Sequence, residues 1–268
     1  MGVLNVTPDS FSDGGRFLDP AVAIAHGRQM FDAGASIVDV GGESSRPGAR
    51  PVSVPEELDR VLPVVESLAK VGRVSIDTTK PEVAEAAIKA GATFVNDISG
   101  SLWPIAAAGG VGWVAMHKQG TPANMQREPR YDRVVDEVLD WCVRHGEQAR
   151  AAGVPEVWID PGIGFGKTTA HNLELLTDLR RFVATGFPVL VGVSRKRFLG
   201  EVTAFGGVNA EPADRLEASL AAATWSICEG VDMVRVHDVA PTVDAVRLVH
   251  DDVSARQLQR PVPHGVAS

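Results

Sequence analysis

The sequence predicts one α/β domain with the TIM (β/α)8 barrel architecture, in which a ring of parallel strands is surrounded by helices. Three observations predict it: eight short apolar runs follow one another along the chain, segments with helical spacing separate them, and Ala-Gly-Ala or Ala-Gly-Val recurs just before a strand. Strand and helix alternating in this way are typical of such a barrel, and 268 residues are enough for one.

The predicted strands are rich in Val and Ile. Most are apolar throughout rather than alternating, as expected for parallel strands covered on both faces. They are Gly2–Val6, Ser36–Gly41, Val74–Thr78, Thr93–Asp97, Trp113–His117, Val157–Asp160, Val189–Val193 and Met233–His237.

The predicted helices lie between these runs, and several begin at a proline or end at a glycine, which are common helix boundary signals. They are Pro20–Ala33, Pro55–Ala69, Pro81–Ala90, Tyr131–Ala152, Asn172–Ala184, Glu211–Glu229 and Pro241–His250, with room for only a short helix within Ser99–Val111. We expect one domain over residues 1–250 and a flexible tail over 251–268. The alternative fold is a doubly wound open sheet, which is disfavoured because Asn5–Gly15 lacks the G-x-G-x-x-G fingerprint.

The composition argues against several classes of protein. A formal net charge of −8 disfavours nucleic acid as the main partner. No apolar run is long enough to span a membrane and no secretory signal is visible, so we expect a cytoplasmic protein that acts on small molecules. Of the two cysteines, Cys142 shares an apolar helical stripe, which indicates a buried side chain rather than a reactive thiol.

Polar side chains gather where the predicted strands end, which is where barrels of this kind place their active sites. Helix capping can explain a few of them, because Asp, Ser and Asn are good caps. It does not explain together the five that we expect to line one ligand site, which are Asp77, Asn96, Asp160, Lys196 and Arg235.

These residue types suit a flat heterocycle that carries an anionic tail. Asp and Asn side chains can pair with a guanidine-like edge, and an Arg guanidinium can stack on an aromatic ring. Arg46, Arg235 and His237 can bind a phosphate group. The structural alternatives are an ordinary ion pair for Arg235 and a core histidine for His237.

The glycine-rich stretch Asp160–Thr168 is similar to a nucleotide P-loop. That pattern requires glycine at the position of Pro161, so a nucleotide site is disfavoured. We expect its glycines to let the backbone approach a ligand held by Asp160, with Phe165 against that ligand. The lone His117 and His237 do not form a zinc site by spacing.

Motifs along almost the whole chain resemble those of the dihydropteroate synthases. The two long ones are Met1–Gly15 and Ile37–Gly48, and short ones follow in order at Ser75–Thr78, Asn96–Ile98, Met116–His117, Gln119–Pro122, Asp160–Phe165, Ser194–Phe198 and Arg235–His237. Each short motif is modest evidence by itself, whereas the ordered set is specific.

The resemblance implies a role for each site residue. The pterin ring would be bound by Asp77, Asn96, Met116, Asp160, Phe165, Gly192, Lys196 and Arg235. The pyrophosphate would be bound by Asn5, Arg46, Arg235 and His237, with Asn5 also near Mg²⁺. The para-aminobenzoate pocket would be formed by Phe11, Ser45, Arg46, Pro47 and Arg197, although Arg197 could instead face solvent. Asp77, Lys196 and Arg235 would be catalytic.

The resemblance also implies the reaction. The enzyme would condense 6-hydroxymethyl-7,8-dihydropterin pyrophosphate with para-aminobenzoate in folate biosynthesis, with Mg²⁺ as cofactor and sulfonamides as inhibitors. The pyrophosphate would leave first, and the aniline nitrogen would then attack the methylene carbon. A homodimer through late helices is expected, with Glu211–Glu229 as a candidate face.

Two alternatives belong to the same fold. A methyltetrahydrofolate-type methyltransferase domain would share the pterin-binding Asp and Asn residues, but it has no need of Arg46 or of the Asp9–Gly15 loop. A non-catalytic pterin-binding paralogue would lose loop residues after the first two strands, and these are present here.

Overall fold

The eight predicted strands form a closed ring. The computed structural model describes residues 1–7, 19–44, 50–120, 125 and 128–258, with side chains described through residue 249. The strands are β1 (Gly2–Asn5), β2 (Ile37–Gly41), β3 (Arg73–Asp77), β4 (Phe94–Asp97), β5 (Gly112–Met116), β6 (Val157–Asp160), β7 (Leu190–Gly192) and β8 (Met233–Arg235). Strands β1 to β6 pair in parallel in chain order, as do β7 and β8. Single parallel bridges, Gly2 to Val236 and Ile159 to Val189, join the two groups and close the ring.

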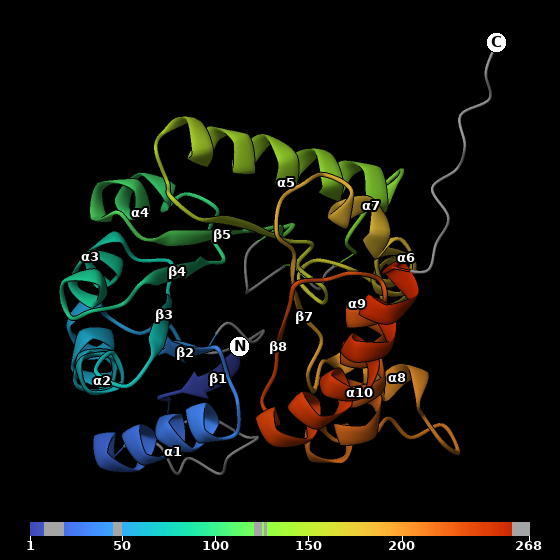
Figure 1. Ribbon diagram of the computed structural model, residues 1–268, viewed down its shortest axis with the longest axis horizontal. Helices are drawn as coiled ribbons and strands as arrows, with labels where there is room; N and C mark the ends of the chain where they lie inside the picture. The colour runs from blue at the N-terminus through green and yellow to red at the C-terminus, as the bar shows by residue number, and fades with distance from the viewer. Residues whose placement is uncertain (8–18, 45–49, 121–124, 126–127, 259–268) are drawn as a thin grey trace.

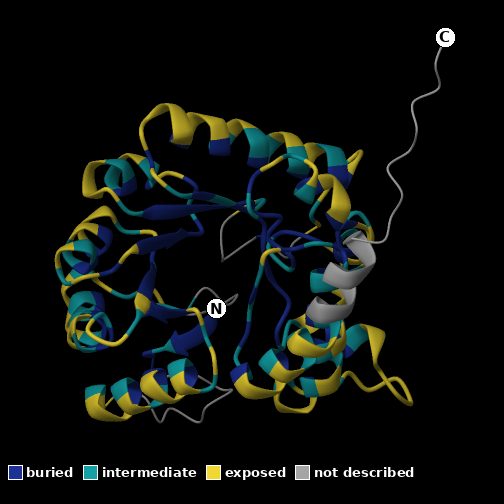
Figure 2. Ribbon diagram, in the orientation of Figure 1, coloured by how far each residue is buried: buried dark blue, intermediate teal, exposed yellow. Residues whose placement is uncertain are grey.

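Helices surround this ring, so the predicted α/β barrel is confirmed (Figure 1). They are α1 (Pro20–Asp32), α2 (Val54–Leu68), α3 (Pro81–Lys89), α4 (Trp103–Gly109), α5 (Val134–Ala151), α6 (Thr169–Thr177), α7 (Leu179–Val183), α8 (Arg197–Val202), α9 (Leu216–Cys228) and α10 (Val239–Leu258), with a 3-10 turn, η1 (Pro212–Asp214), before α9. Their outer faces are exposed and the strands are buried (Figure 2). No helix in the described part of the chain is long and apolar enough to cross a membrane.

The structure corrects three details of the helix prediction. The helix predicted at Asn172–Ala184 is two helices, α6 and α7, which meet at Asp178. Helix α8 was not predicted at all. Helix α10 continues to Leu258, so the first part of the predicted tail is helical, while residues 259–268 lie outside the described residues.

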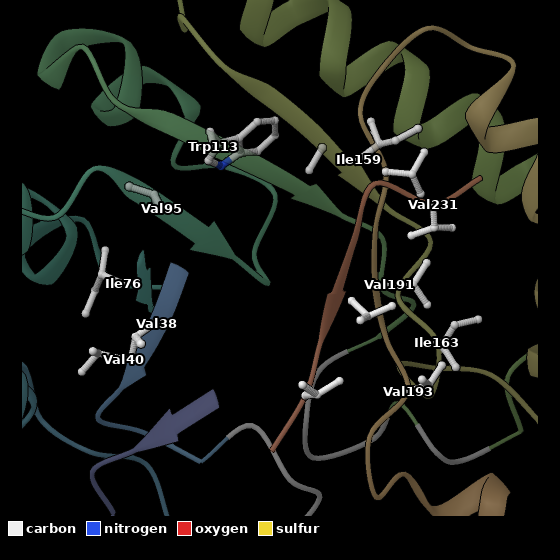
Figure 3. Close-up of a cluster of buried hydrophobic side chains, with 14 of the residues drawn as sticks. Val38, Val40, Ile76, Val95, Trp113, Ile159, Ile163, Val191, Val193 and Val231 are labelled. Atoms are coloured by element: carbon white, nitrogen blue, oxygen red, sulfur yellow. The ribbon is translucent and has the colours of Figure 1, made fainter. Parts of the chain in front are cut away.

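Side chains alternate between the two faces of each strand, so the apolar residues form two separate layers. One layer packs between the strands and the surrounding helices and includes Val38, Ile76 and Val191 (Figure 3). It also contains Cys142, which is fully buried as predicted. A second, smaller cluster contains the strand residues Ile37, Phe94, Val114 and Leu190, with Trp158 and Met233 packed against it. Because alternate side chains point to opposite faces of a strand, this second cluster lies inside the ring.

The same alternation places polar groups above that inner cluster. The residue two positions after an inner apolar residue points to the same face and lies nearer the carboxyl end of the strand. The polar residues at these positions are Asp39, Asn96, Asp160 and Arg235, while Met116 and Gly192 occupy them on β5 and β7. The interior of the barrel therefore has an apolar floor and a polar rim at the end where barrel active sites lie.

Candidate active site

Strand register brings the predicted site residues to one end of the ring. On neighbouring strands, Asn5 pairs with Gly41, Gly41 with Asp77, and Asp77 with Asn96. On the other side, Met116 pairs with Asp160, and Gly192 pairs with Arg235. The predicted convergence is therefore present in the fold.

One side of the site, which we call the Arg235 wall, consists of Asp39, Asp77, Asn96 and Arg235. Arg235 Nε donates to Asp39 Oδ2 at 2.6 Å, and its Nη2 donates to Asp77 Oδ2 at 2.7 Å. Asn96 Nδ2 donates to the same Asp39 oxygen at 2.8 Å. Arg235 therefore forms the ion pair that the sequence analysis named as an alternative, and it does so with two carboxylates. Both hydrogen bonds use the edge of the guanidinium, which leaves its faces for stacking.

Burial dominates the electrostatics of this wall. Burial raises the pKa of Asp77 from 3.8 to about 7, and the neighbouring Arg235 opposes that shift. Burial alone would lower the pKa of Arg235, but Asp39 and Asp77 raise it above its ordinary value. Two carboxylates therefore share one cation, and burial raises the pKa of Asp77 in spite of it.

The opposite side, which we call the lysine wall, consists of Asp160, Phe165, Lys167 and Lys196. Asp160 Oδ1 accepts a hydrogen bond from Gly162 N at 2.7 Å. Lys196 Nζ donates to Ile163 O and lies 4.6 Å from the centroid of the Phe165 ring. Burial lowers the pKa of Lys196 to about 8, against the opposing effect of Asp160, whose own pKa is raised by burial.

Gly192 lies between the two walls. Gly192 has no side chain there, and a Cβ would lie 3.6 Å from Lys196 Nζ and 3.8 Å from Arg235 Cβ. Asn96 Oδ1 is buried and has no hydrogen-bond partner among the described residues. Since a buried acceptor is normally satisfied, this oxygen is available to an N–H donor on a ligand.

Two of the three glycines after β6 have a different role from the predicted one. A Cβ at Gly162 would lie 1.7 Å from His117 O, and a Cβ at Gly166 would lie 2.3 Å from Gln119 O, and both residues have positive φ. These two glycines therefore allow the loop to approach the backbone that follows β5 rather than a ligand. Gly164 is the one beside Lys196.

His237 lies at the rim beside the loop that follows β7. Its Nδ1 is 3.0 Å from Ser194 Oγ, and that hydroxyl accepts from His237 N at 3.2 Å. The imidazole is only half-buried, which disfavours the core-histidine alternative. Nearby, Arg195 Nη2 donates to Asp238 Oδ1 at 2.7 Å, which ties the loops after β7 and β8 together.

Several predicted residues do not join this cluster or cannot be placed. Phe11, Ser45, Arg46 and Pro47 lie outside the described residues. Arg197 begins α8, its side chain is 76 % exposed, and its Nε donates to Glu201 Oε1 at 2.7 Å. This position agrees with the alternative in which Arg197 faces solvent. The rest of the para-aminobenzoate pocket stays a prediction.

Sequence reasoning gave no role to Asp39 or Lys167. Asp39 is fully buried, and Lys167 is 3 % exposed. A carboxylate in the middle of the apolar strand Ile37–Gly41 could have drawn attention to Asp39, because charged residues are rarely buried without a partner. Lys167 stands inside the glycine-rich stretch, where its position matches the lysine of a nucleotide P-loop and no local signal indicates a contact with His117.

The donor set fits a metal ion that arrives with an anionic ligand. In the part of the chain that the structure describes, no group of three His, Cys, Asp or Glu side chains could hold a metal. Magnesium retains most of its waters and needs only one or two protein oxygens. Asn5, half-buried at the end of β1, can supply one such oxygen.

Comparison with known proteins identifies the family of this chain. The family model described as "Pterin binding enzyme" matches residues 1–237. The dihydropteroate synthase of Escherichia coli K12 is 45 % identical over 97 % of this chain and 93 % of its own length. The Yersinia pestis enzyme, solved with a sulfonamide drug, is 42 % identical with a TM-score of 0.89, covering 95 % of this chain and 94 % of that one. The Thermus thermophilus enzyme, solved with 4-aminobenzoate, is 43 % identical with a TM-score of 0.82, covering 94 % and 93 %.

With a matching family model over most of its length and relatives of this similarity, the chain belongs to the pterin-binding enzyme family, among the dihydropteroate synthases.

Proposed function

We propose that this enzyme joins 6-hydroxymethyl-7,8-dihydropterin pyrophosphate to para-aminobenzoate, forming 7,8-dihydropteroate and pyrophosphate in folate biosynthesis. The observation that carries the proposal is the convergence of Asp77, Asn96, Asp160, Lys196 and Arg235 at the carboxyl end of one ring of strands. Among the described residues, no contact in the site favours the methyltransferase or the non-catalytic alternative.

The pterin ring would lie between the two walls. Asn96 Oδ1 and the carboxylate of Asp160 would accept hydrogen bonds from the amino and N–H groups of its guanidine-like edge. The face of the Arg235 guanidinium would stack on the ring, and Lys196 would donate to its carbonyl. Phe165 and Met116 would complete the lining.

The rim would bind the pyrophosphate. Arg235 and His237 are two residues apart, and His237 is oriented by Ser194. Asn5 is the residue that would contact a Mg²⁺ ion carried by the pyrophosphate, and the bound ion would neutralise part of the leaving-group charge.

The reaction breaks the bond between the methylene carbon and the pyrophosphate oxygen, which leaves with the electron pair. The carbon that remains carries positive charge shared with the pterin ring, and the carboxylate of Asp77, placed in the site beside Arg235, would stabilise it. The aniline nitrogen then forms the new C–N bond and loses a proton. No covalent bond to the enzyme is required.

The second substrate would bind above the pterin, near the predicted pocket of Phe11, Ser45, Arg46 and Pro47. The described residues on either side of segment 45–49 are tied together, because Glu43 Oε1 accepts from Val52 N at 2.9 Å. Lys80 Nζ donates to Glu43 Oε2 at 2.6 Å and also to the buried Glu57. This network would hold the base of the loop and with it the site at which sulfonamides compete.

A pyrophosphate-release assay tests the function. Purified enzyme with the pterin pyrophosphate, para-aminobenzoate and Mg²⁺ is expected to release pyrophosphate and form dihydropteroate, and a sulfonamide should inhibit in competition with para-aminobenzoate. Omission of Mg²⁺ should lower the rate. A preparation that binds pterin but never releases pyrophosphate would instead support the non-catalytic paralogue.

The homodimer and the cytoplasmic location stay predictions. Late helices are the proposed dimer face, and their exposed apolar side chains include Trp225 on α9 and Leu248 on α10, which are 48 % and 80 % exposed. Light scattering on purified protein would distinguish a dimer from a monomer, and Trp225→Glu should weaken a dimer formed through this face.

A further inference from the structure

Lys167 is a buried cation for which the proposed reaction has no use. It is 3 % exposed and follows the glycine-rich loop after β6. Its Nζ donates to Gly162 O at 3.0 Å and to Phe165 O at 3.1 Å, and it lies 2.9 Å from His117 Nδ1. All three partners are neutral acceptors, so this side chain is not held by an ion pair.

These contacts connect Lys167 to two residues that would touch the pterin. Gly162, whose carbonyl accepts from Lys167, donates its own N–H to Asp160 Oδ1 at 2.7 Å. Phe165, whose carbonyl also accepts from Lys167, carries the ring that lies beside Lys196. Between them, Ile163 O accepts from Lys196 Nζ. Two lysines therefore bind the carbonyls of one short loop.

The third contact constrains His117. When Lys167 is an ammonium group, it has three N–H donors and no acceptor, so the imidazole accepts at Nδ1 and is neutral. Burial lowers the pKa of His117, and the nearby Lys167 lowers it further, which favours the neutral ring. The ring is fixed by an edge-on contact with Trp141, with centroids 5.3 Å apart.

A lysine at this depth is costly unless it has a specific task. Burial lowers the pKa of Lys167 to about 7, which reflects the free energy spent in removing its charge from water. An apolar side chain of similar length would fill the same space without that cost. It would leave the carbonyls of Gly162 and Phe165 without these hydrogen bonds.

We infer that Lys167 is a positioning residue for pterin recognition, which holds the 160–165 loop so that Asp160 and Phe165 face the ring. The inference rests on the proposed function, because the pterin is the ligand that these two residues would contact. The lysine of the glycine-rich stretch therefore binds the protein's own backbone rather than a phosphate.

The test uses Lys167→Met, which keeps side-chain length and removes the N–H donors. Calorimetry with 6-hydroxymethyl-7,8-dihydropterin pyrophosphate is expected to show affinity weakened about tenfold or more, as for the loss of hydrogen bonds worth about 1.4 kcal/mol or more in total. The KM for para-aminobenzoate should change less than about threefold, because the proposed pocket for that substrate does not include this loop. Lys167→Gln, which retains N–H donors, should recover part of the affinity.

The control is Val65→Ala, a core truncation in α2, where Val65 is fully buried in the helix-facing layer. It should lower the free energy of unfolding and leave pterin affinity unchanged. Pterin affinity that is unchanged in folded Lys167→Met, or reduced equally in Val65→Ala at matched stability, would overturn the positioning role.

Failure of both Lys167 variants to fold would also overturn it, because the residue would then serve the whole fold. A wild-type enzyme that binds pterin without releasing pyrophosphate would contradict the proposed reaction but leave the Lys167 measurement valid. A wild-type enzyme that does not bind pterin at all would overturn both.

Discussion

The two walls of the site hold their cations in different ways. Arg235 is held by two carboxylates, so its position depends on side chains from β2 and β3. Lys196 and Lys167 are held largely by backbone carbonyls of the loop after β6, so their position depends on the shape of that loop. Strands paired on both sides are rigid, whereas a loop is held only by such contacts, and we therefore expect the two walls to respond differently to mutation.

The largest expected effect is on the Arg235 wall. Asp39→Ala should lower the free energy of unfolding by about 3 kcal/mol, because a buried ion pair loses one partner. Asn96 Nδ2 loses its acceptor in the same change. Chemical denaturation measures this, and Asp39→Asn, which keeps an acceptor oxygen without the charge, is the control with a smaller loss. An unchanged denaturation midpoint for Asp39→Ala would show that the wall is not held by this carboxylate.

On the lysine wall, the main effect should be on ligand affinity rather than stability. Asp160→Ala is expected to weaken pterin binding by about 1.5–3 kcal/mol, the range for hydrogen bonds to a charged group. Within the protein its side chain accepts from Gly162 N, so the loss of stability should be smaller than for Asp39→Ala. Calorimetry measures the affinity, with the exposed Glu66→Ala as the matched carboxylate control. Unchanged affinity would mean that Asp160 does not contact the pterin.

A pH series sharpens the comparison at Asp77. Its pKa is raised from 3.8 to about 7, so between about pH 4 and pH 7 the folded protein binds a proton that the unfolded chain has lost. The stability contributed by this group is therefore present at low pH and is lost as the pH rises towards 7. The free energy of unfolding of wild type minus that of Asp77→Asn should fall over this range. A difference that is independent of pH would contradict the raised pKa.

The smallest effect is expected at Arg197, beside the lysine wall. Its exposed ion pair with Glu201 is worth about 0.5 kcal/mol or less, so Arg197→Ala should barely change stability. If the residue faces solvent, the KM for para-aminobenzoate should also be unchanged in steady-state kinetics. A clear rise in that KM, with the KM for the pterin unchanged, would place the guanidinium in the para-aminobenzoate pocket.

Most of the fold could be predicted because its signals are local. Apolar runs and helical spacing depend on neighbouring residues, and they predicted every strand to within about two residues. Helix α8 was missed because it is short and contains Gly200. A Cβ at that position would lie 2.7 Å from Ala210 O and 2.7 Å from Arg215 Nε, so a distant segment requires a glycine inside a helix. No local pattern reports such a contact.

The candidate site could be predicted only in part. The residues at strand ends were identified because barrel geometry requires those ends to meet, and five of them line the rim. Asp39 was given no role because it stands between apolar residues in the strand Ile37–Gly41, where a residue normally belongs to the core. Two glycines were misread because their neighbour is the backbone at His117 and Gln119, which the sequence does not place beside them.

By itself, the sequence determined the succession of strands and helices, the face to which each strand residue points, and the chemical groups available at the rim. Tertiary structure alone decided which acceptor each cation meets. Arg235 bonds to Asp39 across 196 positions of sequence, and Lys167 meets His117 across 50. Hydrogen bonds depend on distances of a few ångströms, and for these pairs the distances are set by closure of the ring and by the packing of its loops rather than by neighbouring residues.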